Sequence, residues 1–274
     1  MGEIYQKCKE AADYIASRID AKGAIGLVLG SGLGNIADNL ENPQIVEYTD
    51  IPHFTKTTVP GHEGKLILGY INGIKVLCMK GRYHFYEGHS MKFITMPVRV
   101  MKLLGVKAII ETNAAGGVNR SFKPGTLMLI DDFINFMGDN PLVGENEEEF
   151  GVRFPGMTLA LSNDLKMAAK KAALDLGIDL KSGVYMSFRG PSFETPAEVK
   201  FAEIADADAV GMSTVPDFIV ARHCEMPICG ISCITNMGAG ITGEELTVEE
   251  VEETSKKVRA DFGRLICRML EYID

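Results

Sequence analysis

The segment AIGLVLGSGLGN (24–35) ends an aliphatic run in three closely spaced glycines and a serine. A strand followed by such a turn directs several backbone N–H groups and the Ser31 hydroxyl toward one point, which suits a small anion. The glycines read G-x-G-x-G, so the last glycine of a dinucleotide fingerprint is missing, and no G-K-[ST] follows for a nucleoside triphosphate. Two interpretations remain for this segment alone: a site for a free anion such as phosphate, or a tight turn without a ligand.

A second group of candidate anion ligands lies in KGRYHFYEGHS (80–90). Arg82 and His84 are two residues apart just after an expected strand, so both side chains point to one side of the chain. Arginine offers a planar fork of donors that suits phosphate oxygens, and histidine adds one more hydrogen bond. His84 and His89 are spaced wrongly for one helical face, and HEGKL (62–66) is not H-E-x-x-H, so we expect no metal site.

The composition limits the classes of function. The chain has 274 residues, of which 46% are hydrophobic and 24% charged, and a formal net charge of −9. This fits a globular protein and argues against nucleic-acid binding. The apolar run ICGISCI (228–234) is far shorter than the roughly 20 residues that cross a bilayer. The N-terminal segment has no signal-peptide pattern, so we expect a cytoplasmic protein without a membrane partner.

The six cysteines make no C-x-x-C pair, which argues against a zinc knuckle or a redox motif. Cys224, Cys229 and Cys233 surround an aliphatic strand. Free cysteine is among the most buried residue types, so we expect buried, reduced thiols here.

Strand and helix patterns alternate in the second half of the chain. Strand-like runs occur at 24–30, 106–112, 126–135, 181–189, 208–213 and 227–235. The segment KLILGYINGIKVLCMK (65–80) is typical of a hairpin, because Asn72-Gly73 suits a two-residue turn. The alternation predicts an α/β fold with a mainly parallel or mixed sheet. No break in composition divides the chain, so we expect a single domain over 1–274.

Three helices have recognisable start signals. Ser162 should begin a helix that ends at Gly177, and TPAE (195–198) offers a capping box with proline at the first helical position. TVEE (247–250) offers a second box that opens a long amphipathic helix. The acidic segment GENEEEF (144–150) is typical of a solvated loop.

Seven blocks of the sequence form a recognisable set: GSGLG (30–34), VPGHEGKL (59–66), GRYHFYEG (81–88), TNAAGGVN (112–119), GPSFETPAE (190–198), VGMSTVPD (210–217) and ITN (234–236). Together they resemble the trimeric-type, 6-oxopurine-specific purine nucleoside phosphorylases. The resemblance implies a single domain whose mixed central sheet is partly closed as a barrel and flanked by helices, assembled as a homotrimer. It also implies reversible phosphorolysis of purine (2′-deoxy)ribonucleosides in purine salvage, with phosphate as a co-substrate and no organic cofactor.

The resemblance also implies roles for individual residues. The phosphate ligands would be Ser31, Arg82, His84, the Ala114 backbone N–H and Ser213, with His62 nearby. The purine would contact Glu194 and Asn236, with Thr235 supporting Asn236, Phe193 packing on the base and Tyr185 lining the pocket. The ribose would contact Tyr86, Met212 and the Phe154 of a neighbouring subunit. Asn236, Glu194 and His84 would be the catalytic residues, and Glu87 would orient Arg82 or its loop.

Two positions bear on the choice of substrate. An amide both donates and accepts hydrogen bonds, so Asn236 predicts inosine and guanosine over adenosine. Many family members have a histidine in the first turn of the last long helix, where it reaches the sugar 5′-hydroxyl, but LTVEEV (246–251) has Val248 there. Valine makes no hydrogen bond, so discrimination against 5′-deoxy and 5′-alkylthio nucleosides should be weak. The alternative activity is therefore a 5′-methylthio-nucleoside phosphorylase of the methylthioinosine type.

Two alternatives come from other classes of protein. The chain could be a nucleoside-binding protein without activity, or a dehydrogenase, although the missing fingerprint glycine argues against the latter. Phosphate-dependent release of hypoxanthine from inosine would separate both from a phosphorylase.

Overall fold

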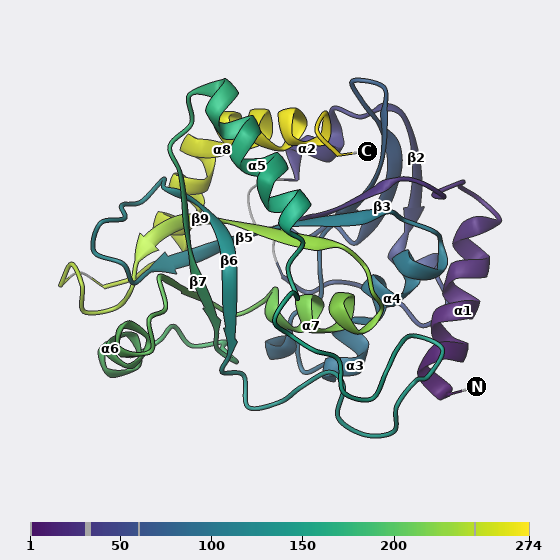
Figure 1. Cartoon of the computed structure of the whole chain (residues 1–274), viewed down its shortest axis with the longest axis horizontal. Coiled ribbons are helices and arrows are strands. Elements are labelled where there is room, and N and C mark those ends of the chain that lie inside the picture. The colour runs from purple at the N-terminus through teal and green to yellow at the C-terminus, as the bar shows by residue number, and fades with distance from the viewer. Residues whose placement is uncertain (1, 31–33, 60, 244, 274) are drawn as a thin grey trace.

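A mixed β-sheet forms the centre of the computed structural model, which describes residues 2–30, 34–59, 61–243 and 245–273 (Figure 1). Its strands are β1 (Ile25–Leu29), β2 (Glu41–Glu47), β3 (Lys65–Ile71), β4 (Ile74–Lys80), β5 (Ala108–Gly117), β6 (Leu127–Asn135), β7 (Leu180–Ser187), β8 (Ala209–Gly211) and β9 (Ile228–Met237). Their order is β2-β3-β4-β1-β5-β8-β7-β6-β9, and β5 also pairs with β9. The strands from β5 to β9 therefore close as a barrel, from which the others extend as an open sheet. The predicted α/β fold with a partly closed, mixed sheet is confirmed.

Helices cover the sheet on both faces. They are α1 (Glu3–Ala16), α2 (Asn35–Asp38), α3 (Met91–Ile94), α4 (Met96–Leu103), α5 (Asn163–Leu176), α6 (Pro196–Ile204), α7 (Val215–His223) and α8 (Val248–Leu270), with 3-10 turns η1 (Tyr48–Asp50) and η2 (Phe85–Glu87). Figure 1 shows α5 and α8 side by side on one face and α4 and α7 on the other. None of the described helices is both long enough and apolar enough to span a membrane.

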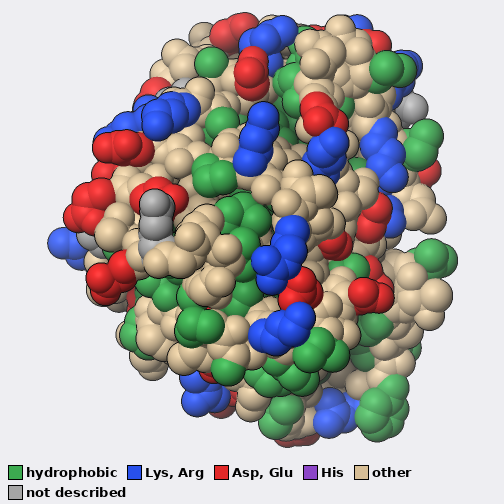
Figure 2. Space-filling model, turned by 90° about the vertical axis from the view of Figure 1, so that its left-hand side faces the viewer, with side chains coloured by type: hydrophobic (Ala, Val, Ile, Leu, Met, Phe, Trp, Pro, Cys, Tyr) green, Lys and Arg blue, Asp and Glu red, His purple; other side chains and the backbone are tan. Residues whose placement is uncertain are grey.

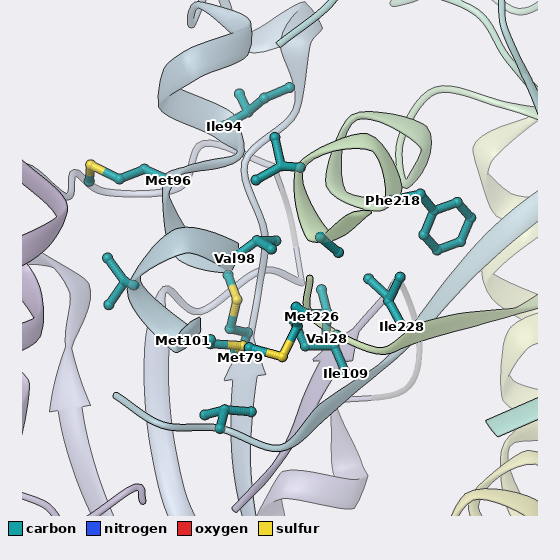
Figure 3. Close-up of a cluster of buried hydrophobic side chains, with 14 of the residues drawn as sticks. Val28, Met79, Ile94, Met96, Val98, Met101, Ile109, Phe218, Met226 and Ile228 are labelled. Carbon is teal, nitrogen blue, oxygen red and sulfur yellow. The ribbon is translucent and has the colours of Figure 1, made fainter. Parts of the chain in front are cut away.

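Apolar side chains fix the strands against α4 and α7. Val28 of β1 and Ile109 of β5 lie in one buried cluster with Val98 and Met101 of α4 and Phe218 of α7 (Figure 3). All five side chains are almost completely buried. Because this cluster anchors β1 and β5, it holds the carboxyl ends of both strands at a fixed edge of the sheet.

The structure confirms the predicted helix ends and hairpin turn, which depend only on residues that are close in the sequence. The Ser162 side chain accepts a hydrogen bond from the third residue of α5, and Gly177 ends the helix in the left-handed conformation. Thr195 begins α6 with the predicted capping box. Asn72 and Gly73 have φ angles of 50° and 79°, which are the two positive values that a type I′ hairpin turn needs.

Two features differ from the sequence-based expectation. The strand β2 was not among the expected strands, because its residues are exposed at almost every position and show no alternation. The segment 144–150 is not wholly solvated, since Glu147 is buried. Its carboxylate accepts hydrogen bonds from the backbone N–H groups of Ile4 (3.2 Å) and Tyr5 (3.1 Å), and therefore caps the start of α1.

The cysteines are free thiols, and Cys224, Cys229 and Cys233 are buried as predicted. Burial raises the pKa of Cys224 to about 11 and the pKa of Cys229 and Cys233 to about 12. Thiols that stay protonated at neutral pH are poor nucleophiles, so these residues belong to the core.

One face of the molecule carries apolar side chains between charged ones. Figure 2 shows them gathered on the side that lies at the left in Figure 1, where α6 is found. Phe201 of α6 is 46% exposed, Phe136 after β6 has the same exposure, and their rings lie 5.2 Å apart. A monomer seldom leaves large aromatic side chains exposed together, so this is a candidate contact surface.

Candidate active site

A cavity opens where the carboxyl ends of four parallel strands meet. The strands β4, β1, β5 and β9 are parallel neighbours, so their ends share one edge of the sheet. Ligands of α/β sheets commonly bind outside such an edge. The cavity is lined by Gly30, Arg82, His84, Tyr86, Asn113, Ala114, Ala115, Gly116, Phe193, Glu194, Val210, Gly211, Met212, Ser213, Thr235, Asn236 and Val251. Motifs that are far apart in the sequence are thus brought to one place.

The predicted anion ligands largely share this cavity. Arg82, His84, Ala114 and Ser213 all line it, whereas Ser31 lies outside the described residues. Arg82 and His84 come from the segment after β4. These two residues are 3% and 7% exposed, so any anion they contact is largely shielded from water.

His84 is held by an acidic partner and by an aromatic ring. Glu87 accepts hydrogen bonds from the His84 backbone N–H (2.7 Å) and from Thr58, and lies 3.2 Å from Nδ1 of the His84 ring. Although burial alone would raise it, the hydrogen bonds from His84 and Thr58 lower the pKa of Glu87 to about 2. The His84 ring also stacks on Tyr86 at 4.8 Å. Glu87 therefore orients His84 and, as predicted, the loop that carries Arg82, whereas the Arg82 side chain itself is held by Glu111 and Thr214.

His62 lies behind the cavity wall. Its Nδ1 accepts a hydrogen bond of 2.8 Å from the backbone N–H of Arg82, and its ring meets the His84 ring edge-on at 5.1 Å. Burial lowers the pKa of His62 to about 3, so the ring is neutral at physiological pH. His62 does not line the cavity. It supports the backbone from which Arg82 extends.

The predicted purine ligands Asn236, Glu194 and Phe193 line the same cavity. The Thr235 hydroxyl lies 2.9 Å from Oδ1 of Asn236 and donates to it, while Nδ2 of Asn236 donates to the Met237 carbonyl oxygen at 3.1 Å. The amide is therefore fixed in one orientation, as predicted for Thr235. Oε1 of Glu194 is buried without a hydrogen-bond partner among the described residues, and burial raises the pKa of this carboxyl.

Tyr185 does not line the pocket, contrary to the prediction. It is fully buried, and its hydroxyl accepts a hydrogen bond of 3.5 Å from the backbone N–H of Ser213. A Cβ atom at Gly211 would lie 2.3 Å from this hydroxyl, so the tyrosine presses directly against the back of the cavity wall. Tyr185 therefore positions Ser213 instead of touching a ligand.

The residues that were predicted to contact the ribose divide into two groups. Tyr86 and Met212 line the cavity. Val248 does not: its side chain is 60% exposed at the start of α8, and Val251, one turn later, lines the cavity instead. Phe154 is 86% exposed and borders a separate hollow, so within its own chain it does not reach the cavity.

Among the residues of the site that were not predicted from the sequence are three polar ones: Glu111, Asn113 and Thr214. The guanidinium of Arg82 donates hydrogen bonds to the Glu111 carboxyl, and at 3.1 Å to Oγ1 of Thr214. The side-chain amide of Asn113 donates to the same Thr214 oxygen at 3.0 Å. Glu111 interrupts the aliphatic run AII (108–110), and a charge in a buried strand is the signal that could have identified it.

Thr214 adopts an unusual backbone conformation next to Ser213. Its φ is 70° and its ψ is −52°, and the Val215 N–H donates to the Ser213 carbonyl at 2.7 Å, which closes a γ-turn. A β-branched residue at positive φ stores strain of about 1–3 kcal/mol, which persists only where surrounding contacts hold it. The hydrogen bonds from Arg82 and Asn113 are such contacts.

Comparison with known proteins identifies the family of this fold. Residues 24–271 match the model of the phosphorylase superfamily. The chain is 54% identical to purine nucleoside phosphorylase 1 of Bacillus subtilis, over 95% of this chain and 96% of that protein. It belongs to the purine nucleoside phosphorylases.

Two solved structures of purine nucleoside phosphorylases are similar to this chain. One is a Schistosoma enzyme in complex with hypoxanthine, and the other is the Schistosoma mansoni enzyme in complex with adenosine. Each superposes with a TM-score of 0.92 at 38% identity, over 98% of both chains. A purine nucleoside phosphorylase must bring an anion and a purine together, and this cavity joins Arg82, His84 and Ser213 to Glu194 and Asn236. It is the candidate active site.

Proposed function

We propose that the chain catalyses reversible phosphorolysis of purine (2′-deoxy)ribonucleosides, chiefly inosine and guanosine, giving free base and (2-deoxy)ribose 1-phosphate. The observation that supports this is the presence of a buried cation, hydroxyl donors and a fixed amide in one cavity. The activity would serve purine salvage in the cytoplasm. Inorganic phosphate would be the co-substrate, and no organic cofactor would be needed.

The chemistry requires stabilisation of two opposite charges. Breaking the N-glycosidic bond builds positive charge on the ribose and negative charge on the departing purine. Phosphate held by Arg82, His84, Ser213 and the Ala114 N–H, with Ser31, would act as the nucleophile and would offset the positive charge on the sugar. A nucleophile that is already aligned gains up to about 7–11 kcal/mol over free encounter. Tyr86 and Met212 would hold the ribose between phosphate and base.

The purine end would stabilise the leaving group. Asn236 would hydrogen-bond N7 and O6, and Glu194 would accept from N1–H, with Phe193 packing on the base. Thr235 supplies the hydrogen bond that fixes the Asn236 amide. An amide that both donates and accepts fits a 6-oxopurine.

A panel of nucleosides tests the proposed activity. Inosine, guanosine, adenosine and their 2′-deoxy forms would be incubated with and without phosphate, and base release measured. We expect phosphate-dependent release, with inosine and guanosine above adenosine. Release of hypoxanthine without phosphate would contradict phosphorolysis, and equal rates with adenosine would contradict the 6-oxopurine preference, which matters because a similar enzyme is known in complex with adenosine.

A 5′-methylthio-nucleoside phosphorylase of the methylthioinosine type is the second candidate, and Val251 favours it. This side chain makes part of the cavity lining apolar. A hydrophobic pocket discriminates weakly against a missing hydroxyl, so kcat/KM for inosine should exceed that for 5′-deoxyinosine by less than about tenfold. Measuring kcat/KM for both substrates tests this candidate. A preference for inosine of about 100-fold or more would show that the 5′-hydroxyl is recognised by hydrogen bonding.

Acid pH should inhibit the reaction through Glu194. The carboxyl must be ionised to accept the purine N1–H, and burial raises its pKa above the ordinary value of 4.5. Activity on inosine is therefore expected to fall as pH drops through this raised pKa, and to be retained above it. The pH profile of kcat/KM measures this. Glu252→Gln, at an exposed residue of α8, provides a control that should keep the acid limb, while persistence of the same limb in Glu194→Gln would contradict the assignment.

We further propose a homotrimer in which Phe154 completes the sugar site of the neighbouring subunit. Phe154 is 86% exposed within its own chain, and a large exposed aromatic side chain is typical of an interface residue. Phe154→Ala should lower kcat/KM for inosine by about tenfold or more with the oligomer intact. Val152→Ala, at a side chain that is also exposed, is the matched control.

Mixed oligomers distinguish a donated Phe154 from one that acts in its own chain. Phe154→Ala protomers mixed with inactive Asn236→Ala protomers would form some sites with an intact pocket and an intact neighbour. Partial recovery of activity after mixing supports donation across the interface. If mixing restores nothing while each oligomer still assembles, the proposed sharing is wrong.

A further inference from the structure

The proposed function leaves one charged residue beside the anion site without a role: Glu111. It lies in β5 and is fully buried. Its Oε1 accepts a hydrogen bond from Nη1 of Arg82. No donor among the described residues reaches its other oxygen, Oε2. An ionised carboxylate with a buried, unsatisfied oxygen is strongly disfavoured, so this geometry favours the neutral acid.

Burial and the charge of Asp217 also favour the neutral form of Glu111. Burial raises the pKa of Glu111 well above its ordinary value and the charge of Asp217 in α7 raises it further, while the charge of Arg82 and a hydrogen bond from Thr214 act against them. Burial also raises the pKa of Asp217 to about 6, against the charges of Arg82 and of Arg99 in α4. Cys229 of β9 is a protonated thiol, since burial raises its pKa to about 12.

The combined charge of Glu111, Asp217 and Arg82 decides whether these residues attract or repel an anion. If Glu111 and Asp217 were both ionised, the two carboxylates would outweigh Arg82 and would repel phosphate. If Glu111 keeps its proton, its carbonyl oxygen still accepts from Arg82, and its hydroxyl can donate to the neighbouring carboxylate of Asp217. The negative charge then lies on Asp217, which Arg99 also faces.

We propose that Glu111 is a positioning residue that stays protonated at neutral pH, donates its proton to Asp217 and so leaves the charge of Arg82 available to the bound anion. The proposal rests on the proposed role of Arg82 as a phosphate ligand. It assigns Glu111 an indirect action: the carboxyl touches the guanidinium and not the substrate.

Infrared spectroscopy tests the protonation directly. Wild type at about pH 7 should show the carbonyl stretch of a protonated carboxylic acid, and Glu111→Gln should lack that band. The control Glu252→Gln changes an exposed residue of α8 and should keep the band. Absence of the band from wild type overturns the proposal, and this reading requires no variant to fold.

Sulfate binding tests the consequence, because sulfate keeps one charge over the range used. Calorimetric Kd values would be measured for wild type, Glu111→Gln and Glu252→Gln between about pH 6.5 and pH 7.5. Wild type and Glu111→Gln should bind sulfate with Kd values that agree to within about threefold across this range, because glutamine replaces a neutral acid. A Glu111→Gln that binds about tenfold more tightly than wild type at pH 7 overturns the proposal, because the substitution would then have removed a negative charge that repels the anion. Neither measurement involves turnover, so a chain that binds sulfate but releases no hypoxanthine would contradict only the proposed function.

Discussion

Replacing Asn236 with alanine is expected to lower kcat/KM for inosine by about 100- to 1,000-fold, by analogy with the removal of one oxyanion donor. The wild-type amide is held by the Thr235 hydroxyl on one side and by the Met237 carbonyl on the other. A group that is already oriented stabilises charge on the departing purine without reorganising. Because that charge develops only in the transition state, the loss should appear in kcat as well as in kcat/KM.

A change of Asn236 to aspartate separates a catalytic amide from a structural one. A carboxylate at this position favours a protonated N7 and a 6-amino group, so the ratio of kcat/KM for adenosine over inosine should rise by at least about tenfold. Asn163→Ala, at the first residue of α5, is the control and should leave both substrates unaffected. An alanine variant of Asn236 that keeps its activity to within about fivefold would show that the amide is not what stabilises the leaving purine.

The features that the sequence predicted are those whose causes lie within a few residues. Ser162 and Gly177 bound α5, and Asn72 and Gly73 form the hairpin turn, because side-chain caps and positive φ angles are local requirements. The site residues were placed by resemblance, and the parallel strands explain why these distant motifs meet. The carboxyl ends of β4, β1, β5 and β9 lie at one edge, so the segments after them converge.

The features that the sequence did not predict depend on contacts between distant segments. Glu147 caps a helix more than 140 positions away, so nothing near it in the sequence indicates its burial. Tyr185 belongs to a strand whose side chains alternate, and only the packing shows that it lies behind Gly211 and not in the cavity. The strained turn at Thr214 is likewise maintained by Arg82, which lies 132 positions away. Val248 was assigned by sequence position, whereas the course of α8 brings Val251 to the cavity.

Replacing Arg82 with methionine should raise the KM for phosphate by at least about 100-fold. Each charge-assisted hydrogen bond contributes about 1.5–3 kcal/mol, and a guanidinium offers an anion two of them. Methionine keeps much of the length of the side chain but makes no such bond. The KM for inosine, measured at saturating phosphate, should change far less. The control is Arg120→Met, at a side chain that is 63% exposed on the surface.

The stability of the same variant connects this prediction to the state of Glu111. If Glu111 were ionised, removing Arg82 would leave an unpaired buried charge and would cost about 3–5 kcal/mol of unfolding free energy. A protonated Glu111 leaves no such charge on its own carboxyl, and the ionised Asp217 still faces Arg99, so Arg82→Met should lose less, and adding Glu111→Gln should restore little. Denaturant unfolding of the single and double variants measures the free energy lost in Arg82→Met and the free energy restored by adding Glu111→Gln. If the phosphate KM stays unchanged while the KM for inosine rises, then Arg82 acts on the nucleoside and the anion is held elsewhere in the cavity.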